Sequence, residues 1–205
     1  ALASPAVALQ QVRLELGRMG DIAVEMLKDT GDALKDNDLQ RLERIARRDD
    51  EVDILEAAIL AYLGKLRRGL LSEQDSAEFQ HLVTAADNLE SLADVIETDI
   101  VGLARKAIGL SQKSSEETRQ MLVQLYEATL KSVELTVTAI RNQDQKAAED
   151  VVMMKETLRQ LADNVLSRKA ERLARLYEEV LVPRAVKAAR TAEDLQAAGK
   201  GTLAG

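Results

Sequence analysis

The stretch that decides the fold is Pro5 to Lys35, PAVALQQVRLELGRMGDIAVEMLKDTGDALK. Its apolar side chains recur in alternating steps of three and four, which places them on one stripe of an α-helix. They are Leu9, Val12, Leu16, Met19, Ala23 and Met26. Ser4 followed by Pro5 is a typical helix start, because a capping residue precedes a proline at the first helical position. The stretch therefore predicts a long helix that buries one face and needs partners to cover it.

Two more helices follow from the same kind of signal. Asp36-Asn37-Asp38 is a polar turn, and Asp38 is a plausible cap for a helix that reaches about residue 71. Ser72-Glu73-Gln74-Asp75 resembles a capping box and opens a third helix, which reaches about residue 108. Long helices joined by short turns pack against each other in antiparallel pairs. We therefore expect an all-α antiparallel bundle.

The second half of the chain repeats the first with a shift of about 106 residues. Asp38 falls on Asp144, and apolar positions mostly fall on apolar positions. Ser114-Ser115-Glu116-Glu117 is a second capping box and opens a fourth helix that ends near Asn142. Asp144 caps a fifth helix that runs toward Pro183, and only a short helical stretch follows.

The chain is therefore expected to hold two tandem three-helix repeats, at 1–110 and 111–205. The second repeat lacks most of its third helix in this interpretation. A repeat that cannot bury its apolar face predicts an exposed apolar groove, a partner, or a truncated chain.

Composition excludes several classes of function. The net charge of −7 and the absence of a Lys/Arg block argue against nucleic-acid binding. The chain has no Cys, which excludes disulfides and thiolate chemistry. A single His and no phosphate-binding loop give no basis for catalysis, so we expect no catalytic residues and no enzyme.

No apolar run approaches the roughly 18 residues that a membrane span needs. We also find no signal peptide, so we expect a soluble chain. The chain begins at Ala1 without Met, which is consistent with a piece cut from a longer protein.

Four carboxylates occur as two pairs spaced four residues apart, Asp49 with Asp53 and Glu90 with Asp94. This spacing stacks two side chains on one helical face, about 5–6 Å apart at Cβ, where like charges repel. Each pair lies about 20 residues, or roughly 30 Å, from the turn near residue 72. Since antiparallel helices reverse their sense of rotation with their direction, we expect the four side chains to converge on one rim of the bundle.

A cation would compensate for this crowding, because clustered oxygen ligands suit hard divalent or trivalent ions. The alternative is a solvated acidic face that Arg44, Arg47 and Arg48 neutralise. Both interpretations remain open from the residues alone. Further acidic residues extend the strip: Glu56, Asp87 and Glu97.

The second half does not keep the acidic pattern, because the shift carries Asp49 and Asp53 onto Lys155 and Arg159. These bases could form an anion site or an ion-pairing surface, but we favour drift in a repeat that no longer needs the site. Glu78-x-x-His81 is one E-x-x-H step. Di-iron bundles need two such steps and two more Glu, so we expect a surface histidine.

The acidic pairs resemble the [Glu/Asp]-x-x-x-Asp motifs of the PhoU family of phosphate-signalling proteins. Residues 88–94, NLESLAD, are similar to that family's L-E-R-I-G-D signature, with Ser91, Leu92 and Ala93 in place of its three middle residues. Residues 1–23 resemble the junction at which bacterial Na⁺/phosphate cotransporters pass from a membrane core into a C-terminal PhoU-like domain.

The resemblance implies two tandem PhoU-like repeats and a metal cluster held by Asp49, Asp53, Glu90 and Asp94. The metal would be a divalent or trivalent ion such as Fe, Zn, Ni or Mg. The implied function is a non-catalytic regulatory domain of a sodium-dependent phosphate cotransporter, on the cytoplasmic side of the inner membrane. Its partner would be the membrane transporter core, in the same or a partner chain, and a homodimer is a further expectation. The alternative is a free-standing PhoU-like adaptor that negatively regulates phosphate uptake and signalling.

Overall fold

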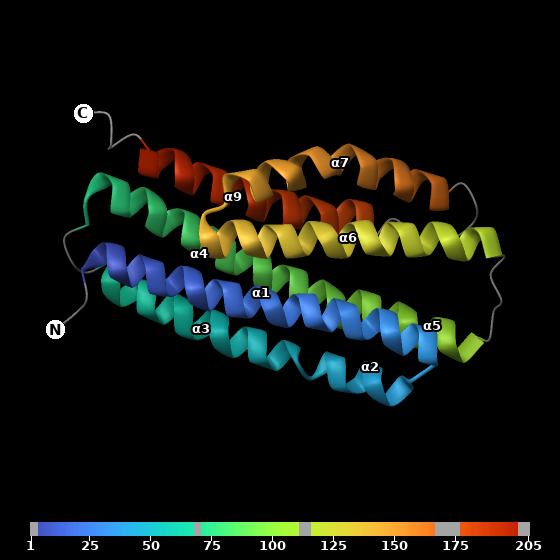
Figure 1. Cartoon of the computed structure of the whole chain (residues 1–205). Helices are drawn as coiled ribbons and strands as arrows, with labels where there is room; N and C mark the ends of the chain where they lie inside the picture. Colours follow the sequence, from blue (N-terminus) through green and yellow to red (C-terminus); the bar gives the residue numbers. More distant parts are fainter. Residues whose placement is uncertain (1–3, 68–70, 111–115, 167–176, 201–205) are drawn as a thin grey trace.

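The computed structural model describes residues 4–67, 71–110, 116–166 and 177–200. These residues form an all-α bundle with no strand, which confirms the predicted fold class (Figure 1). The first half comprises α1 (Pro5–Asp36), α2 (Leu39–Ala46), α3 (Asp49–Leu66), α4 (Glu73–Val95), the π-helical turn η1 (Ile96–Ile100) and α5 (Val101–Leu110). The second half comprises α6 (Glu116–Asn142), α7 (Gln145–Leu166), the π-helical turn η2 (Tyr177–Leu181) and α9 (Val182–Lys200).

Four helices form the centre of the bundle. α1 packs against α4 and α6, and α9 also packs against α4 and α6. The outer helices lie on opposite sides of this centre: α3 packs on α1 and α4, and α7 packs on α6 and α9 (Figure 1). All six residues of the apolar stripe predicted for α1 are buried in the shared core. Within the described residues, no helix is both long and apolar enough to cross a lipid bilayer.

The turns that follow α1 and α6 are built alike. Asn37 and Gln143, which are 106 residues apart, have φ of 56° and 53°, the left-handed conformation that ends many helices. Asp38 and Asp144 then cap the next helices, each accepting a backbone N–H three residues on, at 2.8 and 3.0 Å. The two turns support the repeat that the sequence indicates.

The sixth helical segment is longer than the short stretch that the sequence predicts. η2 and α9 run without a break from residue 177 to 200, pack against α4, α6 and α7, and fill the expected apolar groove. α7 is described as far as Leu166, and the next part of the predicted fifth helix, residues 167–176, lies outside the described residues. Pro183 predicts a helix end because proline lacks an N–H. It is instead the second residue of α9, just beyond the π-helical turn η2, where the regular hydrogen-bond ladder is already interrupted.

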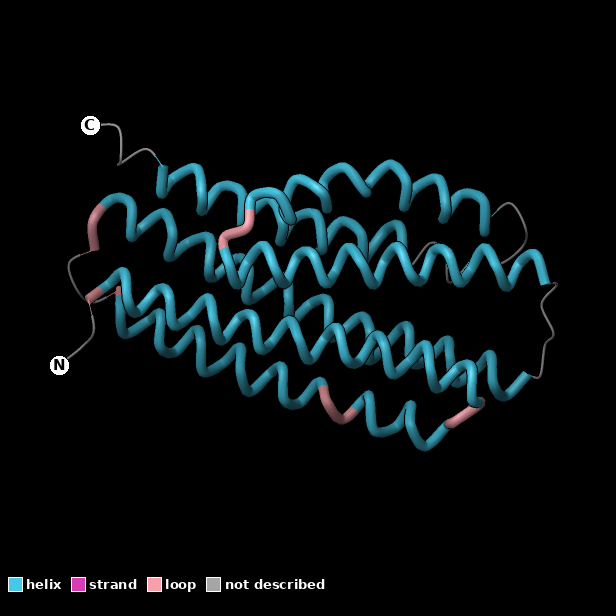
Figure 2. Tube along the Cα trace, viewed as in Figure 1, coloured by secondary structure: helices cyan, strands magenta, loops and turns pink. Residues whose placement is uncertain are grey.

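Two other irregularities divide helices that the sequence predicts to be continuous. The second helix breaks at Arg47 and Arg48, and Figure 2 shows this break as a short loop between α2 and α3. The third helix passes through η1 between α4 and α5. The Arg48 guanidinium reaches Glu25 of α1 at 2.6 Å, so a contact distant in sequence accompanies the first break.

Candidate metal centre

Both irregularities lie beside the acidic residues. Asp49 is the first residue of α3, Asp94 lies one residue before the end of α4, and Glu97 lies in η1. One carboxylate oxygen from each of the three can be chosen so that all lie within 4.8 Å of one another. Asp94 and Glu97 share a face because they are three residues apart on one helical segment.

The start of α3 favours negative charge. Its first turn carries Asp49, Asp50 and Glu51, where free backbone N–H groups and the helix dipole stabilise carboxylates. Asp50 and Glu51 are exposed, whereas Asp49 turns toward α4 and is half-buried. One carboxylate oxygen of Asp49 is shielded from solvent and has no hydrogen-bond partner in the described structure.

Arginine does not neutralise the group. In the described part of the chain, no Lys or Arg forms an ion pair with Asp49, Asp94 or Glu97. The arginines proposed as counter-charges have other partners: Arg44 and Arg48 pair with acidic side chains of the α1–α2 region, and Arg47 donates to a backbone carbonyl of its own helix. The alternative of a solvated acidic face neutralised by these three arginines therefore lacks the ion pairs that it requires.

The crowding changes the protonation of Asp49. Burial raises the pKa of its carboxyl to about 6, with further contributions from Asp53, Glu97, Asp94 and Glu90 in that order. Burial also raises the pKa of Glu90, to which Asp94 and Asp53 add and which a hydrogen bond from Ser91 opposes. A cation bound beside Asp49 would stabilise the charged form of its carboxyl.

Only two of the four metal ligands predicted from the sequence belong to the close carboxylate group. Asp49 and Asp94 belong to the close group, whereas Asp53 and Glu90 lie outside it and act on it through charge. Glu97, which the sequence places only in the wider strip, completes the group. The signal that could have identified it is its spacing of three residues from Asp94.

The chemistry of the donors narrows the choice of ion. Three carboxylates without His or Cys suit hard cations such as Mg²⁺ or Fe³⁺. Zn²⁺ and Ni²⁺ are less well matched, because they favour imidazole or thiolate ligands. The bundle offers open solvent beside Asp94, which is exposed, so water could complete the coordination.

α7, the helix of the second half that corresponds to α3, has basic residues where α3 has Asp49 and Asp53. Arg159 pairs with Glu156 at 2.7 Å and with Asp163 at 2.8 Å, all on α7. Its charge is therefore satisfied within its own helix, which favours drift over an anion site.

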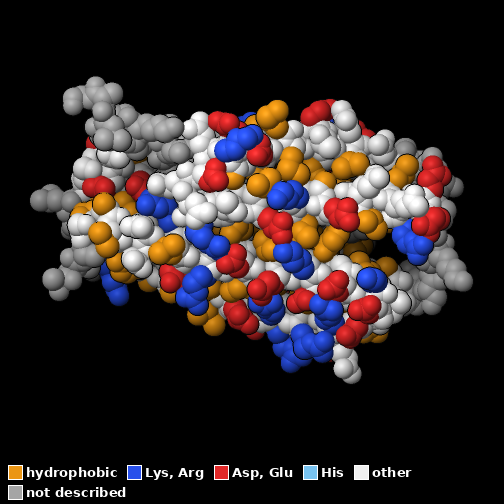
Figure 3. All heavy atoms as spheres, in the orientation of Figure 1, with side chains coloured by type: hydrophobic (Ala, Val, Ile, Leu, Met, Phe, Trp, Pro, Cys, Tyr) orange, Lys and Arg blue, Asp and Glu red, His pale blue; other side chains and the backbone are white. Residues whose placement is uncertain are grey.

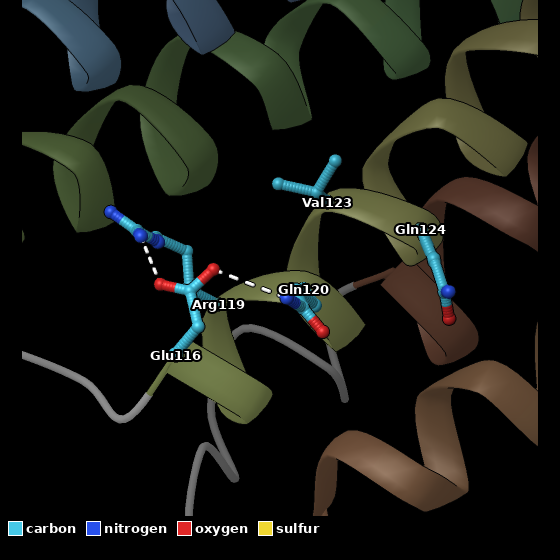
Figure 4. Close-up of a pocket in the computed structure, with 5 residues that line it drawn as sticks. All are labelled: Glu116, Arg119, Gln120, Val123 and Gln124. Carbon is cyan, nitrogen blue, oxygen red and sulfur yellow. Dashed lines mark hydrogen bonds and ion pairs between the residues drawn. The ribbon is translucent and has the colours of Figure 1, made fainter.

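Two other candidate binding sites are less well formed: a depression on α6 and the E-x-x-H step of α4. A depression of about 320 Å³ is lined by five side chains, all from the start of α6 (Figure 4). Glu116 there is occupied by Arg119 and by Gln120 at 3.2 Å, so no set of polar groups converges on a ligand. In the E-x-x-H step, Glu78 forms an ion pair with Arg13 of α1, and His81 is half-buried rather than on the open surface.

The PhoU domain family matches residues 16–98, a stretch that contains both acidic pairs and Glu97. Proteins named "Putative inorganic phosphate export protein YjbB" are 26% identical over 161 residues in Salmonella typhimurium and 24% identical over 159 residues in Escherichia coli K12. The matches cover 78% of this chain but only 29% of each relative, so the chain spans under a third of their length.

Solved structures share the whole fold. PhoU from Pseudomonas aeruginosa superposes with a TM-score of 0.78 and 18% identity, over 96% of this chain and 99% of that one. The phosphate transport system regulatory protein PhoU from Streptococcus pneumoniae gives a TM-score of 0.70 and 17% identity, over 98% and 100% of the two chains. At these identities the likeness concerns the fold.

Proposed function

Because this chain carries a PhoU-like domain on a PhoU-like helical bundle, we propose that it is a non-catalytic regulatory domain in phosphate transport. We further propose that Asp49, Asp94 and Glu97 hold a multivalent cation, with Asp53 and Glu90 adding negative charge around it. The observation that carries the second proposal is the uncompensated carboxylate group: among the described residues, three acidic side chains meet and no Lys or Arg forms an ion pair with them.

The setting that we propose is a sodium-dependent phosphate transporter whose membrane core lies in the same or a partner chain, with this domain on the cytoplasmic side. The longer relatives named for phosphate export support this setting, since the chain matches only part of them. A free-standing adaptor that restrains phosphate uptake is the second candidate. It is supported by the P. aeruginosa PhoU structure, because this chain covers 99% of that protein.

The metal proposal is tested on protein purified without chelator, by elemental analysis and by calorimetric titration with Mg²⁺ and Fe³⁺. Wild type should bind, and D49N/D94N should lose binding because two of the three close ligands become amides. The matched control is E51Q/D99N, which removes the same charge from exposed positions of α3 and η1 and should bind as wild type does. Equal stoichiometry in wild type and D49N/D94N would refute the site.

The variant D53N/E90Q distinguishes the ligand set. If these residues act only through charge, the variant should bind with reduced affinity and unchanged stoichiometry. Complete loss of the ion would make them ligands, as the spacing of the acidic pairs implies.

The transport proposal is tested by phosphate flux in cells whose natural copy of the gene is replaced by wild type, D49N/D94N or the control. We expect D49N/D94N alone to change the rate of phosphate uptake or export. Identical flux in all three strains, and in a strain that lacks the gene, would overturn a role in phosphate transport whether or not the metal binds.

A further inference from the structure

The helix α9 is buried on most of its sides, because it packs against α4, α6 and α7. Of residues 182–191, six are buried. The others are Pro183, Lys187 and Arg190, which are exposed, and Arg184, which is half-buried. Each charged side chain that the structure describes on the outward side of α9 is therefore basic. We call Arg184, Lys187 and Arg190 the basic strip of α9.

The basic strip is not neutralised by the part of the chain that the structure describes. None of its three side chains forms an ion pair with a described residue. The surface over α1 and α2 differs, because acidic and basic side chains lie intermixed there (Figure 3). On that surface Arg41 pairs with Asp29 and Asp32, and Arg48 pairs with Glu25. The basic strip therefore calls for an anionic partner from outside the described residues.

The charge of the whole chain restricts how such a partner would bind. The net charge is −7, so an anionic surface would repel the chain in most orientations and attract it where the basic strip faces that surface. At physiological ionic strength charges interact over about 8 Å. Acidic residues on the far side of the bundle would therefore not oppose the contact, and the strip selects one orientation.

The geometry of the strip suits an extended anionic surface better than a single small anion. Its residues are three positions apart, so they span about 9 Å along the helix axis. All three come from the convex outside of one helix, whereas a small-molecule site is concave and collects polar groups that converge on the ligand. A layer of anionic lipid headgroups presents many negative charges in one plane, which matches the strip.

We propose that the basic strip of α9 lies against anionic lipid headgroups at a membrane surface, with Arg184, Lys187 and Arg190 contacting the phosphates. This inference rests on the proposed setting of the domain beside a membrane core, and it is independent of the bound cation. It also assigns an orientation: α9 lies parallel to the membrane plane. α1, which shares the neighbours α4 and α6 with α9 and lies diagonally across the centre of the bundle, faces away.

Three basic side chains give weak binding by themselves. Each Lys or Arg close to an anionic membrane strengthens the association about fivefold, so three together contribute about a hundredfold. A weak contact is sufficient for a domain held beside a membrane, because the linkage raises the effective concentration of lipid at the strip. We therefore expect the separate 205-residue chain to bind vesicles weakly and in a salt-dependent manner.

Co-sedimentation with vesicles tests the proposal. Vesicles of equal parts phosphatidylcholine and phosphatidylglycerol are compared with vesicles of phosphatidylcholine alone. Wild type should bind the anionic vesicles only, and about 1 M salt should release it, because the screening length is then about 3 Å. The variant R184Q/K187Q/R190Q should bind about a hundredfold more weakly.

The matched control is R105Q/K106Q/K131Q, which removes the same charge from exposed positions of α5 and α6. It should bind the anionic vesicles as wild type does, since these positions lie outside the strip. Circular dichroism verifies that both variants remain helical.

A fluorescent label tests the orientation. The chain has no Cys, so a single introduced cysteine can carry the label. On anionic vesicles, a label at E179C, an exposed position of η2 close to the strip, should be shielded from acrylamide in the water. A label at Q10C, an exposed position of α1, should remain accessible.

Equal vesicle binding by wild type and R184Q/K187Q/R190Q would overturn the proposal, as would shielding of Q10C instead of E179C, because another face would then meet the membrane. Absence of wild-type binding to anionic vesicles would overturn it in favour of an acidic protein partner. Each of these results leaves the phosphate-flux test of the proposed function unchanged, so failure of the lipid contact and failure of the proposed function are distinguishable.

Discussion

Asp49 is subject to two opposing effects. The start of α3 favours its carboxylate by about 0.3–1 kcal/mol, as helix N-termini generally do. Burial and four neighbouring carboxylates disfavour the same charge, and the pKa of about 6 shows that they outweigh the helix. In the metal-free protein Asp49 therefore reduces stability at neutral pH.

This balance predicts a pH dependence with a definite sign. Because the folded pKa lies above the ordinary value of 3.8, the folded state binds the proton more tightly, and stability falls as pH rises from about 4 to about 6. A shift of this size has an upper limit of about 3 kcal/mol, which partial exposure reduces to about 1 kcal/mol. D49N should stabilise chelator-treated protein by about that amount at pH 7 and not at pH 4. Thermal unfolding at several pH values measures it.

The control for this prediction is D50N, which removes an exposed carboxylate from the same turn. It should not stabilise the protein, because it loses the favourable helix contact without relieving any crowding. Equal effects of D49N and D50N would contradict the proposed electrostatic cause.

Sequence reasoning located Asp49 and Asp94 because spacing and helix length place them at one level. It could not distinguish the close group from its surroundings. Whether Glu97 or Glu90 completes the group depends on the rotation and tilt of two helices. The break before Asp49 and the π-helical turn after Asp94 alter both, and neither follows from a local pattern.

At the scale of elements, the contact between α1 and α6 depends on glycine. A β-carbon on Gly20 would lie 2.5 Å from Val137, and one on Gly31 would lie 2.5 Å from the Tyr126 hydroxyl. That hydroxyl donates a hydrogen bond to the Leu27 carbonyl at 3.2 Å. The absence of side chains on one face of α1 thus lets the two repeats approach closely.

Replacement of glycine by alanine should therefore lower the stability of the protein at one position and raise it at another. G20A should destabilise the protein by about 1–3 kcal/mol, because branched Val137 has little freedom to move. G102A should stabilise it by about 0.5–1 kcal/mol, because a β-carbon there meets no atom within 4 Å and alanine favours helix. Chemical denaturation midpoints of both variants measure the difference. Equal changes in stability for G20A and G102A would mean that α1 and α6 leave room for a β-carbon between them.

Helix boundaries followed from the sequence where capping residues mark them, as at Ser4, Asp38 and Asp144. The sequence did not predict a helix boundary where contacts between residues distant in the chain determine it. The break between α2 and α3 accompanies the reach of Arg48 to Glu25, 23 residues earlier. Pro183 lies at the start of α9, directly beyond η2, and η2 packs against α4 and α7.

At the scale of the whole molecule, the two predicted repeats share one core. Leu9 of α1, Leu82 of α4, Val133 of α6 and Val186 of α9 belong to the same buried cluster. Each repeat therefore covers apolar surface of the other. The division into 1–110 and 111–205 describes the pattern of the chain, and we do not expect it to describe separate folding units.

We expect calorimetry to show one unfolding transition, with a calorimetric enthalpy equal to the van't Hoff value. The enthalpy should be about 140 kcal/mol near 60 °C, given about 0.7 kcal/mol per residue. G20A should lower the temperature of the entire transition, since it affects the contact between the repeats. Two resolved transitions would show that the repeats unfold independently.

The start of α1 and the end of α9 lie at the same end of the bundle (Figure 1). A pulling force applied across these two points would peel the helices away one turn at a time instead of sliding them past one another. Few contacts would resist at any moment, so the bundle should unravel at low tension even though it is stable to heat. A force spectrometer would then record gradual extension in place of one abrupt rupture.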